Sequence, residues 1–250
     1  MVFRMLVGNL LREATQSSLR GVVEQAAQGP RSPADVEGPV DVLVAMALAQ
    51  EAGGLVDLLT DAVHLSGQGF TERLGRLGKR RLAIVETGVG AARAAAAVDE
   101  ALARRRPQWV ISAGFAGGLS DALHRGHFLL ADRVAAQAGG AFEIGLAVDR
   151  AALAATPGVH VGTLLTVDRV MQSAEEKRRL GERHAALACD METAAVAAVC
   201  AKAKSRLLSV RVISDAVDDT LPPEVEKLLA QDSTAGKVGA AASALWNRPA

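Results

Sequence analysis

Short apolar runs alternate with alanine-rich stretches along most of the chain. The runs are rich in Val, Leu and Ile, as buried strands are, and the alanine-rich stretches have helical length. Because the runs are apolar throughout, the pattern predicts an α/β sheet covered on both faces. The expected strands are 42–44, 82–85, 109–111, 159–166 and 207–213, and the expected helices are 51–59, 91–105 and 191–202, with a last helix from about 223.

The N-terminal segment has a different pattern. Residues 3–27 place Leu6, Leu10, Val22 and Val23 at mostly helical spacing with charges between them, and Gly and Pro residues at 29–33 then break the pattern. We therefore expect an amphipathic helix and linker over 1–38, followed by one catalytic domain over 39–250. The mixed charges favour docking on the domain or on another subunit over binding to a membrane surface.

Composition narrows the choice of partner and compartment. Lys plus Arg equals Asp plus Glu at 28 each, so no net field favours nucleic acid or anionic lipid, and a small ligand is expected. No stretch reaches the ~20 apolar residues of a membrane span, and the first eleven residues make a poor signal peptide. Cys189 and Cys200 form neither a disulfide framework nor a metal-binding spacing, so we expect reduced thiols and a cytoplasmic location.

Several common catalytic motifs are absent from the sequence. It contains no GxSxG elbow, no Walker A loop and no HExxH motif. Gly88 and Gly90 open a helix after a strand, but Arg93 replaces the third glycine of a dinucleotide-binding turn. The five histidines lack a metal-binding spacing, although His124 and His127 lie three apart in a Gly-containing turn. We expect no cofactor and no metal.

Polar residues follow the apolar runs where ligands bind in open α/β sheets. They are Gln50–Glu51, residues 87–90, residues 112–118 and Ser214–Asp215, together with the Asp190-Met191-Glu192 sequence at a helix start. Each also has a purely structural interpretation. Asp215 can be a helix or turn cap, Asp190 and Glu192 can offset a helix dipole, and Glu51 can be a first-turn helix residue.

The motifs together resemble the purine-nucleoside phosphorylase and nucleosidase superfamily, and most closely its methylthioadenosine/S-adenosylhomocysteine nucleosidases. The similarity extends over about residues 41–235 in collinear order. It covers residues 45–51, 86–90, 112–119, 161–164, 188–197 and 210–215. The resemblance implies a three-layer α/β/α domain with a central mixed sheet, assembled as a homodimer or larger homo-oligomer.

The resemblance also implies a role for individual residues. Asp215 would donate a proton to purine N7, and Ser214 would orient it; Glu192 would bind both ribose hydroxyls with Met191 beneath the sugar. Glu51 would hold or deprotonate the attacking water. The remaining assignments are a base pocket formed by Val170, Met171, Asp190 and Ser214, and a nucleophile or anion pocket formed by Thr87, Gly88, Phe115 and Arg211.

Two departures from the family pattern bear on function. Phe115 stands where hexameric phosphorylases place a phosphate ligand, which with Glu51 favours hydrolysis; Arg93, Arg169 and Arg211 leave phosphate as the alternative nucleophile. Val170 replaces the expected aromatic partner of the base, so the base is expected between aliphatic side chains, with Phe115 or Phe142 contributing. A non-catalytic nucleoside-binding module is the remaining alternative. The nucleoside stays open: methylthioadenosine, adenosylhomocysteine, futalosine or a lipid-linked compound.

Overall fold

The computed structural model describes residues 37–219 except 68, 146–148, 150–151 and 154. Its strands are β1 Val42–Met46, β2 Thr60–Gly67, β3 Phe70–Leu77, β4 Arg80–Glu86, β5 Trp109–Gly118, β6 Phe128–Ala136, β7 Ala141–Glu143, β8 Val159–Thr166, β9 Ala186–Asp190 and β10 Arg206–Asp215. Its helices include α3 Ala49–Val56, α4 Ala91–Arg105, α6 Ala174–His184 and α7 Thr193–Ala203. The predicted helices over 3–27 and from 223 lie outside the described residues, so the division at residue 38 stays a prediction.

The strands form one mixed sheet in the order β10-β6-β8-β9-β5-β1-β4-β3-β2, with β7 added to β6. β1 is parallel to β4 and β5, whereas β3 is antiparallel to both β2 and β4. β10 pairs with β5 as well as with β6, so the strands β5, β10, β6, β8 and β9 close into a ring. The predicted central mixed sheet is confirmed.

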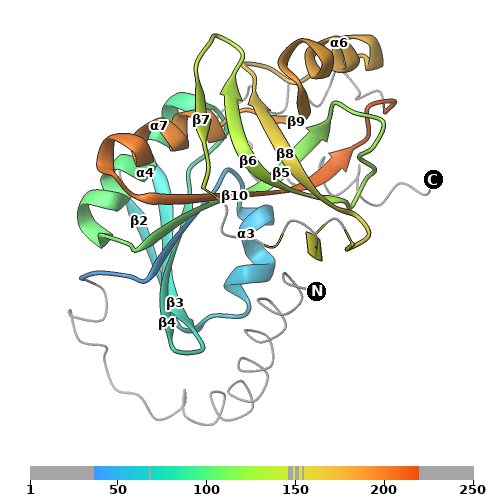
Figure 1. The fold of residues 1–250 in the computed structure, drawn as a ribbon. Helices are drawn as coiled ribbons and strands as arrows, with labels where there is room; N and C mark the ends of the chain where they lie inside the picture. The colour runs from blue at the N-terminus through green and yellow to red at the C-terminus, as the bar shows by residue number, and fades with distance from the viewer. Residues whose placement is uncertain (1–36, 68, 146–148, 150–151, 154, 220–250) are drawn as a thin grey trace.

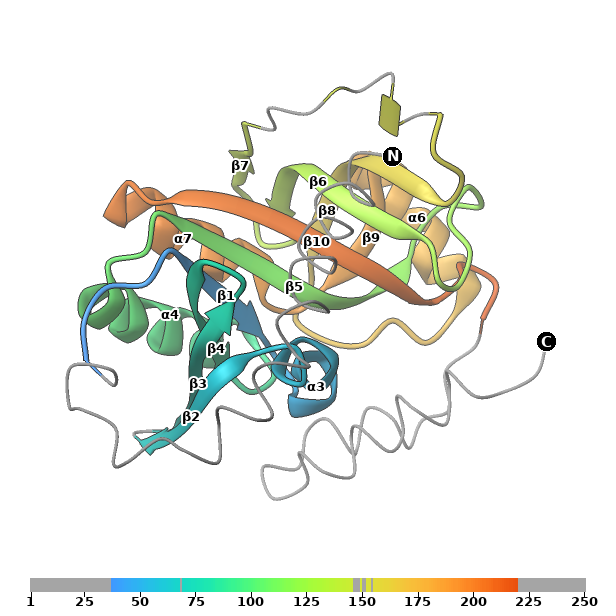
Figure 2. The same ribbon diagram turned by 90° about the horizontal axis from the view of Figure 1, so that it is seen from below.

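Helices cover both faces of the sheet, as alternate residues of β1 show. Leu43 and Ala45 pack in one apolar cluster with residues of α4 and α7, whereas Val44 and Met46 pack in another with residues of α3. Figure 1 shows α4 and α7 together and α3 across the sheet from them, and Figure 2 shows α6 beside the ring of strands. The α/β/α layering is therefore confirmed.

The boundaries of α4 and β8 match the prediction, whereas β6, β9 and α6 were not predicted and other segments have different bounds. The expected helix over 51–59 forms as α3 and ends at Val56. β5 continues to Gly118 through residues 112–118, which were expected to follow the strand, because it pairs with β10 along its length. The β2–β3 hairpin was not predicted, since several of its residues are polar and partly exposed and its apolar runs are short.

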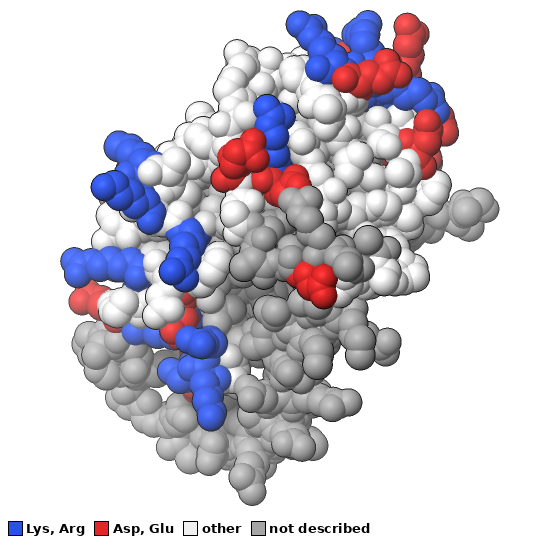
Figure 3. Space-filling model, viewed as in Figure 1, with Lys and Arg blue, Asp and Glu red and all other residues white. Residues whose placement is uncertain are grey.

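A buried ion pair fastens the hairpin to α4. Arg105, at the end of α4, donates two hydrogen bonds of 2.8 and 2.7 Å to Glu72 of β3, and both side chains are almost fully buried. Elsewhere charges of both signs mix on the surface near α6, while Lys and Arg gather along one edge of the same face (Figure 3). Among the described helices none is long and apolar enough to cross a membrane.

Candidate active site

A gap in the sheet beside β5 creates the candidate site. Residues 109–112 of β5 pair with β1, but its last two residues, Gly117 and Gly118, pair instead with β9. Residues 113–116 therefore lack a strand partner on this edge, at the carboxyl end of β1. A break in strand order at the carboxyl ends of strands is where α/β proteins form ligand crevices.

Glu51 occupies this gap. It lies in the first turn of α3, and its carboxylate accepts the backbone N–H of Phe115 at 2.8 Å and that of Leu48 at 2.9 Å. Burial raises the pKa of Glu51, and these two N–H groups offset part of that increase. A Cβ at Gly114 would lie 2.5 Å from Oε1 of Glu51, so only glycine leaves room for the carboxylate. Glu51 thus caps its helix and also faces the site.

Glu192 lies across the same pocket from Glu51. It is the N-cap residue of α7, and its Oε1 accepts the N–H of Gly90 at 2.8 Å. Burial raises the pKa of Glu192 to about 7, and the negative charge of Asp190 adds to the increase. Gly88 and Gly90 have φ angles of 76° and 103°, which shape the turn that carries this N–H group. The turn and α7 together fix the carboxylate at the pocket wall.

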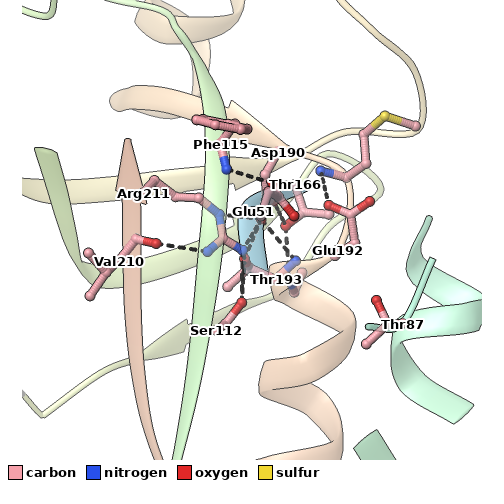
Figure 4. Close-up of polar contacts among 12 residues, drawn as sticks. Glu51, Thr87, Ser112, Phe115, Thr166, Asp190, Glu192, Thr193, Val210 and Arg211 are labelled. Carbon is pink, nitrogen blue, oxygen red and sulfur yellow. Dashed lines mark hydrogen bonds and ion pairs between the residues drawn. The ribbon is translucent and has the colours of Figure 1, made fainter. Parts of the chain in front are cut away.

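Arg211 and Asp190 form a buried network behind the pocket (Figure 4). The guanidinium donates to Asp190 at 2.9 and 3.2 Å, to the hydroxyl groups of Ser112 and Thr193, and to a backbone carbonyl. Asp190 also accepts from Thr166 at 2.7 Å and from the N–H of Thr193 at 3.1 Å. Both charged groups are thus bonded within the protein. Asp190 accepts an N–H group at the start of α7, which fits its purely structural interpretation, and its contact with the base stays a prediction.

Asp215 is buried at the end of β10, beyond a β-bulge at Ser214 that changes the direction of the strand's last side chain. Its Oδ1 accepts the Ser214 hydroxyl at 2.7 Å, as the sequence analysis expected for an orienting serine. Its Oδ2 lies 2.6 Å from Nζ of Lys177. These contacts are to side chains, so the helix-cap interpretation does not describe Asp215.

Lys177 was not among the predicted site residues. Its only signal is a lysine on the apolar face of α6, where Lys177, Leu180 and Gly181 are the buried positions.

One segment of β5 relates Glu51 to Asp215. Glu51 binds the N–H of Phe115, and Gly117 approaches Asp215 so closely that a Cβ there would lie 3.1 Å from Oδ2. Two residues of a strand span about 7 Å. Glu51 and Asp215 therefore contact β5 at positions about two residues apart along the strand. The glycines at 114 and 117 provide room for the two carboxylates.

The pocket beside Glu51 encloses about 10 Å³, which is room for about one water molecule. Its lining includes Glu51, Thr87, Phe115, Glu192 and Arg211. The structure thus brings together most of the predicted nucleophile pocket. The Thr87 hydroxyl bonds to the carbonyl of Gly88 and is drawn apart from the Arg211 network (Figure 4).

The residues predicted to contact the base and the sugar differ in how deeply they are buried. Met171 is 3% exposed and packs in the apolar cluster with Leu119 and Leu165, so its predicted contact with the base is disfavoured by burial. Val170 and Met191 are half-buried and stay candidates for contacts with the base and the sugar. Within the described part of the chain, no three His, Cys, Asp or Glu side chains gather as metal ligands would.

Comparisons with known proteins agree on one family. The model of the phosphorylase superfamily matches residues 40–245. A 5′-methylthioadenosine/S-adenosylhomocysteine nucleosidase from Haemophilus ducreyi is 29% identical over 194 residues, covering 69% of this chain and 83% of that protein. The protein of the same name from Colwellia psychrerythraea is 26% identical over 210 residues, covering 73% of this chain and 86% of that protein.

Solved structures support the same fold. An Asp-to-Asn variant of the Helicobacter pylori nucleosidase, with 5′-methylthioadenosine in the active site, gives a TM-score of 0.66 at 17% identity and covers 83% of this chain and 98% of that chain. The Neisseria meningitidis nucleosidase in complex with methylthio-immucillin-A gives a TM-score of 0.64 at 22% identity, covering 84% of this chain and 96% of that chain.

Proposed function

The chain belongs to the phosphorylase superfamily, and from this premise we propose that it hydrolyses the N-glycosidic bond of an adenine-type purine nucleoside and releases the free base. The observation that carries the proposal is the position of Glu51, held against β5 at the gap in the sheet, about two strand residues from Asp215. The similar nucleosidases from Haemophilus ducreyi and Colwellia psychrerythraea support the same reaction and an adenine-type substrate.

Glu51 is proposed to activate the attacking water. Burial raises the pKa of Glu51, and a carboxylate with a raised pKa accepts a proton more readily from water. The N–H groups of Phe115 and Leu48 hold the carboxylate in place at the wall of the pocket.

Glu192 is proposed to bind the two ribose hydroxyls. An ionised carboxylate accepts both hydroxyls and lies near the ring as positive charge develops on it, which stabilises an oxocarbenium-like transition state. Because the pKa of Glu192 is about 7, binding of the ribose should strengthen as pH rises through neutrality. Met191 would pack beneath the sugar.

Asp215 is proposed to supply the proton that the departing base needs. The proton passes to purine N7 as the C1′–N9 bond breaks, and the electrons of that bond stay with the base, which leaves as a neutral molecule. Ser214 and Lys177 hold the two carboxylate oxygens in position. Water then adds to C1′ on the opposite face of the sugar and gives a proton to Glu51.

Phosphate as the nucleophile finds less support. A phosphate site needs converging donors, and Arg211, the arginine in this pocket, is bonded to Asp190, Ser112 and Thr193. Phe115 offers the site a backbone N–H, which Glu51 already accepts. The internal bonding of Arg211 favours hydrolysis over phosphorolysis.

The test uses the full-length chain and a panel of purine nucleosides that differ at the 5′ position, with adenine release measured with and without inorganic phosphate. We expect release that is independent of phosphate, suppressed at least 100-fold by Asp215→Asn and by Glu192→Gln. Asp121→Asn, at an exposed aspartate, is the matched control and should keep full activity. Protection against melting by nucleosides without any base release would show a binding module instead and overturn the proposal.

We also propose a compartment and an assembly for the enzyme. It is cytoplasmic and forms a homodimer or larger homo-oligomer. The support for the compartment is that Cys189 and Cys200 are both buried free thiols. Gel filtration with light scattering tests the assembly.

A further inference from the structure

Lys177 is a buried cation. In the reaction proposed above, its role is to hold one oxygen of the Asp215 carboxylate in position. Its side chain is 1% exposed, and its partner Asp215 is 6% exposed. An ammonium group has three hydrogens, and Nζ has three acceptors: Oδ2 of Asp215 at 2.6 Å and the carbonyl oxygens of Ala216 and Asp219, each at 2.9 Å. Every donor of the ammonium group is therefore satisfied inside the protein.

The fold brings α6 close enough for this contact. Ser173 caps the helix by accepting the N–H of Glu176 at 3.2 Å, which places Lys177 in the first turns. A Cβ at Gly181 would lie 2.5 Å from the carbonyl oxygen of Leu119, so the absence of a side chain at Gly181 lets α6 lie against that backbone. Lys177 is on the same helix face and reaches the end of β10.

Among the described residues, a thiol and two acids lie near the pair. Cys189 of β9 lies beside it, and burial raises the pKa of that thiol so that it stays protonated. Burial also raises the pKa of Asp219, but the N–H of Ala216 and the guanidinium of Arg125 outweigh it and lower the pKa overall, so Asp219 stays ionised. Glu176 of α6 pairs with Arg169 at the surface. Neither neighbouring acid is placed to give a proton to Asp215.

We propose that Lys177 and Asp215 act as one acid, in which Lys177 supplies the proton that Asp215 passes to the leaving base. The proposal rests on the proposed function, because it concerns the proton required for departure of the purine. Lys177 acts through Asp215 and is a positioning and proton-supplying residue that does not itself contact the nucleoside.

The proton transfers balance without another reactant. One Nζ–H bond breaks and one Oδ2–H bond forms, so an ammonium–carboxylate pair becomes an amine–carboxylic acid pair with the same number of protons. The ammonium–carboxylate form keeps two charges in a buried site, and the neutral form removes both of them. The carboxylic acid then gives its proton to N7 while the C1′–N9 electron pair moves to the base. The amine then recovers a proton from solvent, and Glu51 returns to solvent the proton that it took from the attacking water.

Two variants separate proton supply from positioning. Lys177→Arg keeps the positive charge and the donors, but a guanidinium does not give up its proton. We expect it to bind nucleoside with little change in KM and to lower kcat for adenine release about 100-fold. Lys177→Met removes both the charge and the proton. Thermal melting of each variant checks that it is folded.

The pH at which kcat falls in Lys177→Met shifts in opposite directions depending on whether Lys177 supplies the proton or only positions Asp215. If the pair is the acid, wild-type activity persists above neutral pH and the alkaline fall moves to lower pH in Lys177→Met, because the carboxyl group must hold its own proton. If Lys177 only positions an ionised carboxylate, removing its charge makes that carboxyl hold a proton more readily, and the fall moves to higher pH. A shift to higher pH, or none, overturns the proposal, as does a wild-type fall already complete below pH 7.

A second substrate distinguishes loss of the proton supply from damage to the fold. p-Nitrophenyl riboside releases a stable phenolate that needs no proton, so both Lys177 variants should hydrolyse it within a few-fold of wild type while losing adenine release. Parallel loss of both activities means that Lys177 is structural and overturns the proposal. A wild-type protein that releases no base from any nucleoside instead refutes the proposed function itself.

Discussion

Replacement of Arg211 by methionine tests whether this arginine is a structural residue or a phosphate ligand. Methionine fills much of the same volume but offers no charge and no hydrogen-bond donor. The change leaves Asp190, which is 6% exposed, without its cationic partner. Removing one member of a buried ion pair costs about 3–5 kcal/mol.

The hydrogen bonds of the network place the expected loss near the lower end of that range. Asp190 keeps the hydroxyl of Thr166 and both the N–H and the hydroxyl of Thr193 as donors. We therefore expect about 3 kcal/mol, which for a domain of this size lowers Tm by about 6–12 °C. The double variant Arg211→Met/Asp190→Asn should lose at least about 1 kcal/mol less than the sum of the single variants, because neither charge is left alone.

Urea unfolding and adenine release are the two assays. The matched control is Arg105→Met, which breaks the buried pair with Glu72 away from the site and should cost a similar free energy without changing kcat/KM in the folded protein. A loss below about 1 kcal/mol for Arg211→Met would refute the structural role. Adenine release that requires phosphate in the wild type, with a much higher KM for phosphate in Arg211→Met, would instead show that the arginine binds a phosphate nucleophile.

Three further predictions concern the pocket. Glu51→Gln should lower kcat about 10²–10⁴-fold without lowering Tm at pH 7, since it removes a buried charge; activity within ten-fold of wild type would contradict its role as the base. Glu192 has a pKa of about 7 in the folded protein against 4.5 when unfolded, so the folded form binds more protons and the contribution of Glu192 to stability falls as pH rises from 4.5 to 7. Glu192→Gln should remove that fall, which is on the order of 3 kcal/mol. The prediction is wrong if the free energy of unfolding, measured in urea, depends on pH in the same way for the variant and the wild type. Gly114→Ala should displace the Glu51 carboxylate and lower kcat at least ten-fold at a cost of about 1–3 kcal/mol, whereas Gly54→Ala, whose Cβ meets nothing within 4 Å, should leave kcat unchanged.

Local patterns in the sequence predicted much of the fold. The alanine-rich stretch predicted α4 from Ala91 to Arg105, and the apolar run 159–166 predicted β8. Both predictions succeeded because the pattern of each element lies in residues that are adjacent in the chain. The motifs also pointed to the superfamily and to Glu51, Glu192 and Asp215 as residues of one site. The roles of these three residues come from the resemblance to the superfamily, because each stands at a position that matches one of its motifs.

Contacts between distant residues required the tertiary structure. Glu51 reaches the N–H of Phe115 across 64 positions, Glu192 reaches that of Gly90 across 102, and Lys177 reaches Asp215 across 38. No periodicity encodes these separations, because they depend on the gap between β1 and β9 and on the closure of five strands into a ring.

The sequence by itself determined the class of fold, the family and the acidic residues at the strand ends. Only the tertiary structure decided that Asp190 and Arg211 neutralise each other inside the protein and that Asp215 has a buried lysine as its partner. The physical reason is that a charged side chain takes its role from the charges and donors folded against it. Those neighbours come from other parts of the chain, and burial makes their presence or absence count by several kcal/mol.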